Sequence, residues 1–492
     1  MELTALAGAQ VLVTGWGMSG RAVVGPLQDL GAHITLTDAR PASRDEVTAL
    51  GHDFATADDL RGSLDRFALV ITSPGFRPEA PVLVAATAAG VPVWGDIEFT
   101  WRVDEAARYG PTRRWLVVTG TNGKTTTTSM LASILSAAHL GGVACGNIGL
   151  PVLDALRRPE VEVLAVELSS FQLYWAPSVR PAAGVVLNIA EDHLDWHGGM
   201  GGYIAAKQRA LSGDVAVVGL DDPIAAALPH TAGFRLGPPE HGELGVVDGM
   251  LVDRAFVGAG DTAGDTAADT AATLGPVVGI SPPGPAGVLD ALAAAALARA
   301  IGVSPEAVAA GLAAHRVGPH RAEIVHEIGG VGFADDSKAT NPHAARSSLL
   351  AHPSVVWLAG GQLKGAAVDD LVAEIAPRLR GAVLIGLDAD LIAQALARHA
   401  PDVPVVTVRS RDDAGVTTEA GVTRVTPDAD AVMARAVRTA AGLARPGDVV
   451  LLAPAAASLD MFTSYGHRGD SFAAAARGLT GPEIGSDAGT SR

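Results

Sequence analysis

The sequence lacks the features that mark secreted and membrane-spanning proteins. It has a single cysteine, Cys145, so no intramolecular disulfide can form. Asp290, Arg299 and Pro454 interrupt the apolar stretches before they reach the roughly 18 residues of a membrane-spanning helix. The first residues, MELTALAGAQ, do not have the charged and then apolar order of a signal peptide. We therefore predict a protein of the reducing cytoplasm that does not enter the membrane.

Clustered positive charge is also missing. The chain has 36 basic and 53 acidic residues, a net charge of -17, and no run rich in lysine or arginine. Binding to a phosphate backbone depends on clustered cations that release counterions, so nucleic acid is not an expected partner. Local basic sites for small anions remain compatible with this balance.

Large cores are expected, because 48% of the 492 residues are hydrophobic and only 18% are charged. At about 150 residues per domain, the length predicts roughly three domains. Short apolar runs alternate with alanine-rich periodic stretches in three sets, which is a β-α-β rhythm typical of α/β folds. We place the domains at 1-108, 109-318 and 319-492, and expect the first and the last to be Rossmann-like.

The rhythm fails between residues 237 and 286. An Asp248-Gly249 pair between alternating apolar residues predicts a β-hairpin there. The following GAGDTAGDTAADTAATLGP repeats DTA and has no aromatic residue or cation, so we expect it to be mobile and predict a flexible surface insertion over 237-286. A disordered tail is predicted for 480-492 on the same grounds.

The strongest local signal is TGTNGKTTTTSM at 119-130, an apolar strand followed by a glycine turn and a helix. Backbone N-H groups of such a turn converge on phosphate oxygens at the helix N-terminus. Lys124 would reach the outer phosphates, and the Thr125 hydroxyl would coordinate Mg²⁺. The alternative is a glycine turn with a solvated lysine. We predict an ATP-type ligand with Mg²⁺.

A second glycine motif, TGWGMSG, follows the first strand. Gly15, Gly17 and Gly20 form G-x-G-x-x-G, with Asp38 at the end of the next strand and Arg40 just beyond it. The motif is typical of dinucleotide sites, but it recognises a pyrophosphate, which a UDP-sugar also carries. NAD, another nucleotide and a purely structural turn therefore all stay open here.

Three further residues have both an ordinary and a functional interpretation. Glu167 ends a strand predicted beside the phosphate loop, where it is either salt-bridged or a Mg²⁺ ligand. His193 is either a capping or core residue, or a site residue. Lys207, in the helix YIAAKQR, would ordinarily lie on a solvated face.

The segment GTNGKTT resembles the ATP-binding signature of the Mur ligase superfamily. Further segments resemble its branch that adds D-glutamate to UDP-N-acetylmuramoyl-L-alanine, a step of cytoplasmic peptidoglycan precursor synthesis: GDIEF (95-99), GNIG (146-149), ELSSFQL (167-173), NIAEDHLDWH (188-197), DDSKATN (335-341), GGQLKG (360-365) and LAPAAASLDMF (452-462). The resemblance implies an ADP-forming ligase that acts through an acyl phosphate. Folylpolyglutamate synthase, which shares the ATP loop, and an NAD-binding oxidoreductase are the alternatives.

The resemblance also implies roles for individual residues. Two ions of Mg²⁺, or Mn²⁺, would be held by Thr125, Glu167, His193 and Lys207, with Lys207 carbamylated, and the catalytic residues would be Lys124, His193 and Lys207. ATP would be bound by Gly120, Thr121, Asn122, Gly123, Lys124, Thr125, Thr126, Asp290, Arg321 and Asp336. The UDP-sugar would contact Ser19, Gly20, Asp38, Arg40, Gly75 and Asn147. D-Glutamate would contact Lys338, Thr340, Lys364, Ser458, Leu459 and Tyr465, with Phe462 near them.

One segment departs from the family pattern. The family has H-N-x-x-N at the start of the alanine-rich helix, where this chain has A-G-V-L-D at 286-290. Asp290 would stand in for the second asparagine.

We expect the protein to be a monomer.

Overall fold

The computed structural model describes residues 1-40, 42-257, 271-409, 416-419, 422-425 and 428-485. They form two compact units, one of residues 1-280 with 287-315 and the other of 281-286 with 316-485. The predicted boundary near 318 therefore lies close to the observed division after His315. The boundary predicted near 108 does not separate compact units.

The first sheet of unit 1 has five parallel strands in the order β3-β2-β1-β4-β5. This is the order of a Rossmann-like half, as predicted for the N-terminal segment. Its elements are β1 (Gln10–Thr14), α1 (Met18–Asp29), β2 (His33–Thr37), α2 (Ala42–Ala49), β3 (Asp53–Phe54), β4 (Leu69–Thr72), α3 (Pro81–Ala88), β5 (Val93–Gly95) and α4 (Asp96–Glu105).

The second sheet of unit 1 has nine strands in the order β14-β13-β12-β11-β10-β9-β6-β8-β7. Its strands are β6 (Arg114–Thr119), β7 (Gly142–Gly146), β8 (Val163–Glu167), β9 (Ala183–Val186), β10 (Val215–Gly219), β11 (Ala232–Phe234), β12 (Glu243–Val247), β13 (Met250–Asp253) and β14 (Ala272–Pro276). Its helices are α5 (Lys124–Ala137), α6 (Val152–Leu156), α7 (Ser170–Tyr174), α8 (Leu194–His197), α9 (Met200–Gln208), α10 (Pro223–Ala226), α11 (Pro285–Ala300) and α12 (Pro305–Ala314).

The segment 237-286 is partly a continuation of this sheet. The predicted hairpin is confirmed, because β12 and β13 pair antiparallel around Asp248 and Gly249. β12 also pairs with β11, and β14 pairs with β13. These strands correct the prediction of an insertion over the whole of 237-286, since they bury Leu244, Leu251 and Leu274 in the central core. Most of the DTA repeat, 258-270, lies outside the described residues, as does 486-492 of the predicted tail.

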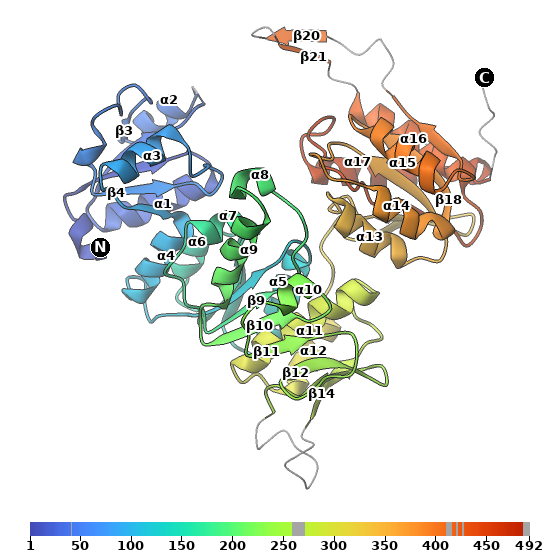
Figure 1. Ribbon diagram of the computed structural model, residues 1–492, viewed down its shortest axis with the longest axis horizontal. Coiled ribbons are helices and arrows are strands. Elements are labelled where there is room, and N and C mark those ends of the chain that lie inside the picture. The colour runs from blue at the N-terminus through green and yellow to red at the C-terminus, as the bar shows by residue number, and fades with distance from the viewer. Residues whose placement is uncertain (41, 258–270, 410–415, 420–421, 426–427, 486–492) are drawn as a thin grey trace. The chain divides into compact units, whose positions relative to one another are not determined.

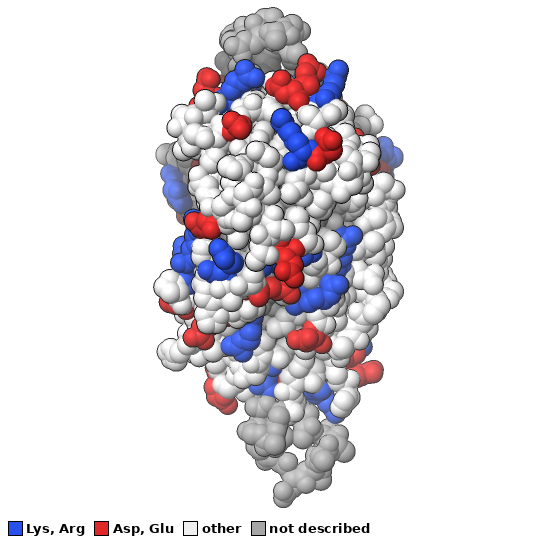
Figure 2. Space-filling view, turned by 90° about the vertical axis from the view of Figure 1, so that its left-hand side faces the viewer, with Lys and Arg blue, Asp and Glu red and all other residues white. Residues whose placement is uncertain are grey.

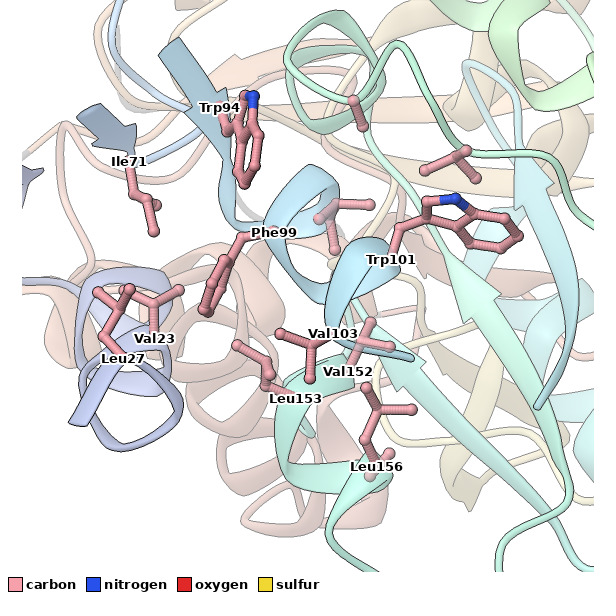
Figure 3. Close-up of a cluster of buried hydrophobic side chains, with 14 of the residues drawn as sticks. Val23, Leu27, Ile71, Trp94, Phe99, Trp101, Val103, Val152, Leu153 and Leu156 are labelled. Atoms are coloured by element: carbon pink, nitrogen blue, oxygen red, sulfur yellow. The ribbon is translucent and has the colours of Figure 1, made fainter. Parts of the chain in front are cut away.

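The first two sheets share one hydrophobic core, which explains why they form a single unit. Figure 3 shows Phe99 and Val103 of α4 between α1, which carries Val23 and Leu27, and α6, which carries Leu153. The same cluster contains residues of both β1 and β6. Helix α4 has no solvent-facing side over most of its length, because elements of both the N-terminal and the central part of unit 1 cover its side chains. A single buried core joins the predicted domains.

Unit 2 is built around a sheet in the order β15-β16-β22-β17-β18-β19, parallel except for β15. Its strands are β15 (Glu323–Ile328), β16 (Val331–Asp335), β17 (Val355–Gly360), β18 (Leu379–Ile385), β19 (Val405–Thr407) and β22 (Val449–Leu452), with β20 (Val416–Glu419) and β21 (Val422–Val425) as a separate pair. Its helices are α13 (Pro342–Leu350), α14 (Asp369–Ile375), α15 (Ala389–His399), α16 (Ala429–Leu443) and α17 (Tyr465–Arg477).

Alternate residues of β17 face opposite sides of this sheet. Trp357 packs with α13, α14 and α15, whereas Leu358 packs with α16 and α17. Figure 1 labels these helices around β18 of the same sheet. Helices on both faces agree with the prediction of a Rossmann-like unit, although the strand order differs from that of the first sheet.

The surface in Figure 2 carries acidic and basic side chains next to one another. Among the described residues, no helix combines the length and the apolar character that a membrane crossing requires.

Candidate active site

The central glycine loop connects β6 to α5 and has the backbone geometry of a phosphate loop. Gly123 has a φ of 83°, in the left-handed region that favours glycine. A Cβ at Gly123 would lie 2.2 Å from Oδ1 of Asp290, so a side chain is excluded there as well. The first turn of α5 therefore begins at Lys124 with its backbone N-H groups unpaired within the helix, as an anion site requires.

Neighbouring segments hold this loop in place. The backbone N-H of Thr121 donates to the carbonyl of Asn188 at 2.9 Å. The Asn188 side chain accepts from the Asn122 N-H at 2.9 Å and donates to the Asn122 carbonyl at 3.2 Å. The loop is thus fixed by β9 and the residues after it.

Two lysines converge on one carbonyl of the loop. Nζ of Lys124 donates to the carbonyls of Gly120 (2.9 Å) and Thr121 (2.8 Å), and Nζ of Lys207 donates to that of Gly120 at 2.6 Å. Lys207 is 1% exposed, which corrects the ordinary interpretation of a solvated helix face. Burial, followed by the positive charge of Lys124, holds the pKa of Lys207 well below its usual range, and Asp192 opposes this only weakly. Burial and the neighbouring charge thus both favour the neutral amine of Lys207 over its ammonium form.

Tyr203 connects Lys207 to the loop. The Nζ of Lys207 lies 4.6 Å from the centre of the Tyr203 ring, one helical turn earlier on α9. The Tyr203 hydroxyl is hydrogen-bonded to that of Thr121 at 3.0 Å. Tyr203 was not among the predicted site residues.

Glu167 ends β8 beside the loop strand, where it pairs in register with Val118. Its Oε1 accepts a hydrogen bond from the Asn147 side chain at 2.8 Å. Its Oε2 is buried and accepts no hydrogen bond, an arrangement that is costly unless an ion or a donor joins it. This carboxylate oxygen, with the Thr125 hydroxyl on the first turn of α5, has the oxygen chemistry that Mg²⁺ prefers. Among the described residues, no three His, Cys, Asp or Glu side chains form a metal cluster by themselves.

His193 begins α8 in a left-handed conformation, with a φ of 52°. Its Nε2 lies 3.5 Å from a carboxylate oxygen of Asp192, and its ring lies 4.7 Å from that of Phe171. The side chain is 38% exposed. His193 is therefore accessible at the edge of the group, next to α7.

Asp290, which is predicted to lie near ATP, lies beside the glycine loop. Its Oδ1 accepts a hydrogen bond from the Thr127 hydroxyl at 3.1 Å. The carboxylate is buried between α11 and the start of α5. The departure at 286-290 thus leaves a polar side chain next to Gly123.

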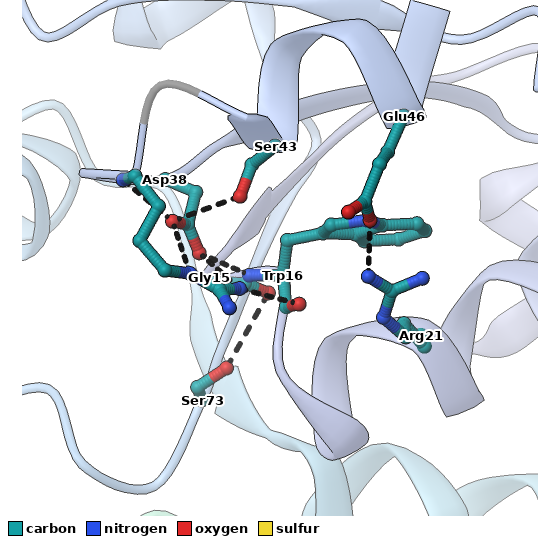
Figure 4. A network of polar contacts seen from close by, with 8 residues as sticks. Gly15, Trp16, Arg21, Asp38, Ser43, Glu46 and Ser73 are labelled. Atoms are coloured by element: carbon teal, nitrogen blue, oxygen red, sulfur yellow. Dashed lines mark hydrogen bonds and ion pairs between the residues drawn. The ribbon is translucent and has the colours of Figure 1, made fainter. Parts of the chain in front are cut away.

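The N-terminal glycine loop has a different electrostatic environment. A Cβ at Gly20 would lie 1.9 Å from the Gly15 carbonyl, so the close approach of α1 to β1 requires glycine. The Asp38 carboxylate accepts hydrogen bonds from the N-H of Trp16 (2.6 Å), from Arg40 and from Ser43 (Figure 4). Burial raises the pKa of Asp38, but these hydrogen bonds, first that of Arg40, outweigh it and lower the pKa to about 2. Asp38 is a fixed anion in this loop.

The other predicted contacts for the UDP-sugar lie around the same strand ends. Ser19 is on the first turn of α1 and donates to Asp96 at 2.7 Å. Arg40 donates to the Trp16 carbonyl at 2.7 Å. Gly75 is exposed in the loop after β4, and Asn147 lies in the central domain beside Glu167.

In unit 2, the residues predicted for D-glutamate follow three neighbouring strands. Lys338 and Thr340 follow β16, Ser458 and Leu459 follow β22, and Lys364 follows β17. These strands are adjacent and parallel, so their carboxyl ends share one edge of the sheet. The Nζ of Lys338 lies 3.9 Å from the centre of the Tyr465 ring. Lys364 and Leu459 are exposed, whereas Ser458 and Phe462 are buried.

Arg321 and Asp336 interact at the start of the same unit. Burial raises the pKa of Asp336 to about 6, against the hydrogen bond from Ser348 and the charge of Arg321. The structure thus brings together the two residues of unit 2 that were predicted to bind ATP.

Comparison with known proteins agrees with this geometry. A model of the Mur ligase middle domain matches residues 118-234, and one of the Mur ligase glutamate ligase domain matches residues 320-456. UDP-N-acetylmuramoylalanine–D-glutamate ligase of Rhodococcus jostii is 64% identical over 496 residues, covering 97% of each chain. The enzyme of the same name from Nocardia farcinica is 64% identical over 489 residues, covering 98% of each. The chain belongs to the Mur ligase family.

Solved structures of this family share the fold of this Mur ligase. The ligase MurC of Thermotoga maritima matches with a TM-score of 0.53 and 18% identity, covering 91% of this chain and 95% of that one. MurF of Acinetobacter baumannii matches with a TM-score of 0.55 and 17% identity, covering 97% and 93%.

Two side chains next to the candidate sites of this Mur ligase, His197 and Arg468, were not among the residues predicted from the sequence. His197 lies among aromatic side chains and accepts or donates at Nε2 to the Ser170 hydroxyl at 2.9 Å. Burial, followed by the charges of His193 and Lys207, lowers the pKa of His197 to about 4. Arg468 is buried in α17 and donates to the Ser337 and Ala456 carbonyls, which connects two of the loops predicted for D-glutamate. His197 lies in the motif NIAEDHLDWH, whereas Arg468 lies beyond the motif LAPAAASLDMF, and neither side chain carries a signal of burial in the sequence.

Proposed function

We propose that this Mur ligase joins D-glutamate to UDP-N-acetylmuramoyl-L-alanine at the expense of ATP, in the cytoplasmic assembly of peptidoglycan precursors. The central glycine loop is the observation that carries the proposal: two lysines and a buried carboxylate oxygen surround a helix start that suits phosphates. The names of relatives at 64% identity support the same substrates.

The reaction needs activation because a carboxylate does not react with an amine directly. ATP transfers its terminal phosphoryl group to the L-alanyl carboxylate, and the D-glutamate amine attacks the acyl phosphate with release of phosphate. The ammonium side chain of Lys124 and the α5 N-terminus stabilise the charge that develops on the phosphate oxygens. We leave the proton acceptor for the amine unassigned.

Glu167 and Thr125 supply oxygen ligands for Mg²⁺, and His193 and Lys207 are proposed for a second ion. A bound divalent ion supplies charge neutralisation for the phosphoryl group. The unpaired Oε2 of Glu167 supports this assignment. Asn147 holds the other oxygen of Glu167 and so orients the carboxylate.

Lys207 is proposed to carry a carbamate. A neutral amine adds to CO₂ and loses one proton, which converts a cation into a carboxylate-like group. The burial of Lys207 and its lowered pKa support this reaction, since they favour the neutral amine. The chain has only four lysines, Lys124, Lys207, Lys338 and Lys364, so a ¹³C carbamate signal from labelled bicarbonate can be assigned with a single Lys207→Arg variant.

D-Glutamate is assigned to unit 2. Lys338 and Lys364 bring cations for its carboxylates, and Thr340 and Ser458 bring hydroxyl groups. Arg321 and Asp336 are assigned to ATP in that unit. Ser19, Gly20, Asp38, Arg40, Gly75 and Asn147 are assigned to the UDP-sugar, and the protein is proposed to act as a monomer.

Product analysis tests the proposal. ATP, Mg²⁺, UDP-N-acetylmuramoyl-L-alanine and D-glutamate should yield a nucleotide product whose mass increases by one glutamate residue, and L-glutamate should not replace the D isomer. A folate substrate consumed in preference to the UDP-sugar would instead indicate folylpolyglutamate synthase. Binding of NADH without turnover of the UDP-sugar would favour an oxidoreductase.

A further inference from the structure

Asp96 occupies an unusual place between the N-terminal glycine loop and the central domain. It is the first residue of α4, directly after β5 ends at Gly95. Its Oδ2 accepts a hydrogen bond from the Ser19 hydroxyl at 2.7 Å. Its Oδ1 is buried and has no hydrogen bond of ordinary geometry, although the N-H groups of Asp96 and Ile97 and the Gln172 side chain act on the carboxylate and lower its pKa. The bond from Ser19 is thus the one side-chain hydrogen bond of ordinary geometry on this carboxylate among the described residues.

The hydrogen bond to Asp96 fixes the first turn of α1. Ser19 lies on that turn, whose backbone N-H groups have no partner within the helix and are suited to phosphate oxygens. The Ser19 hydroxyl has one proton, and it is directed to Asp96. The hydrogen bond therefore fixes the position of this first turn of α1. It leaves the backbone N-H groups of the turn available to an anion.

On its other side, Asp96 adjoins the central domain. The Gly95 N-H donates to the Trp175 carbonyl at 3.0 Å, and a Cβ at Gly95 would lie 2.6 Å from Cβ of Trp175. The Gln172 side chain faces Asp96 and lowers its pKa, although burial raises that pKa more strongly. The Gln172 side chain also accepts a hydrogen bond from the N-H of Ser169 at 3.0 Å. Ser169 lies two residues after Glu167.

We propose that Asp96 is a positioning residue for the UDP-sugar, which holds Ser19 and the first turn of α1 against the segment that follows Glu167. The inference rests on the proposed function, because it takes the N-terminal glycine loop as the site of the substrate's diphosphate. Asp96 acts as a hydrogen-bond acceptor in this role and needs no charge. An asparagine side chain can accept from Ser19 in the same way, and it lacks the negative charge that would repel a diphosphate.

Binding of UDP-N-acetylmuramoyl-L-alanine by calorimetry tests this role in the full chain. We expect Asp96→Ala to raise the Kd about tenfold, the upper end of the usual effect of losing one hydrogen bond, while Asp96→Asn stays within threefold of wild type or binds more tightly. Ser19→Ala should also weaken binding, and the double variant should be no weaker than Asp96→Ala alone. The Kd for an ATP analogue should stay within twofold in all of them.

Asp29→Ala is the matched control, because Asp29 is the last residue of the same helix and pairs with Arg157 far from the glycine loop. It should leave the Kd for the UDP-sugar within twofold. An unchanged Kd in Asp96→Ala, or additive effects of the two substitutions, would overturn the inference. If Asp96→Ala does not fold, an unchanged Kd in Ser19→Ala overturns it as well. Failure of the wild-type protein to bind the UDP-sugar would instead contradict the proposed function, and the inference with it.

Discussion

The two glycine loops of unit 1 have the same backbone plan and different charged partners. Each follows a buried parallel strand and leads into a helix. In the N-terminal loop the Asp38 carboxylate accepts from the Trp16 N-H, and Arg40, which is paired with Asp38, donates to the Trp16 carbonyl. In the central loop two lysine amines share the Gly120 carbonyl. The glycine pattern therefore specifies how the chain turns, and the surrounding side chains specify which ligand fits.

This difference matches two kinds of nucleotide. An anion at the first loop favours ligands that offer hydrogen-bond donors, such as the hydroxyl and N-H groups of a nucleoside. Cations and an unpaired carboxylate oxygen at the second loop favour phosphates with a divalent ion. The G-x-G-x-x-G motif with Asp38 after it left NAD open, and it is membership of the Mur ligase family that favours the proposed UDP-sugar.

The largest expected effect is at the central loop. Lys124→Ala should lower the turnover number by about 10²–10³, the usual loss when a charge-stabilising donor is removed from a transition state. Phosphate release measures it. Arg61→Ala, at an exposed ion pair with Asp58 in the N-terminal domain, is the control and should stay within twofold. Turnover within threefold of wild type in Lys124→Ala would mean that the loop does not bind the transferred phosphoryl group.

Lys207 should have the next largest effect. Both Lys207→Ala and Lys207→Arg should lower turnover by about 100-fold, since an arginine keeps the charge but cannot carry a carbamate. The ¹³C carbamate signal should vanish in both variants and persist in Lys124→Ala. A carbamate signal that survives in Lys207→Arg would show that another lysine carries it.

At the N-terminal loop the effect should be smaller and confined to one substrate. Asp38→Ala should raise the Kd for the UDP-sugar about tenfold, because it removes an acceptor and releases Arg40. The Kd for an ATP analogue should not change. Equal losses for both nucleotides would break the comparison between the two loops, since they would indicate a general loss of structure.

The smallest effect concerns stability at acid pH. The folded state lowers the pKa of Asp38 from 3.8 to about 2, so its contribution is complete above pH 4 and is lost as the pH falls toward 2. A shift of this size corresponds to at most about 2.5 kcal/mol of unfolding free energy, and solvent screening of the Asp38–Arg40 pair reduces it to about 1 kcal/mol. Urea unfolding at pH 6 and pH 3 should show a smaller pH-dependent loss for Asp38→Asn than for wild type. Equal losses would show that the Asp38 pKa is not lowered.

The sequence predicted the parts of the site that depend on local patterns. Strand ends place Glu167, Asp336 and Ser458 where the rule for parallel sheets expects them, and the loop at Gly120 follows from its glycines and the lysine after it. These features are set by a few adjacent residues. Their neighbours in space could therefore be anticipated from the order of the strands.

The sequence could not predict features that depend on distant contacts. YIAAKQR has the same pattern whether Lys207 is solvated or buried, and only packing of α9 against the loop decides it. The hairpin of β12 and β13 was predicted, but β14 and the pairing of the hairpin with β11 were not, because glycine, proline and short alternation give a weak strand signal at a sheet edge. The shared core of the first two sheets depends on α4, whose Phe99 and Val103 meet residues from both.

One measurement tests the central claim most directly: phosphate release with ATP, Mg²⁺ and UDP-N-acetylmuramoyl-L-alanine, with D-glutamate present or omitted. The account predicts sustained phosphate release only when D-glutamate is present, because its amine must attack the acyl phosphate to complete the cycle. Equal sustained rates with and without D-glutamate would contradict the assignment of this chain as a D-glutamate ligase.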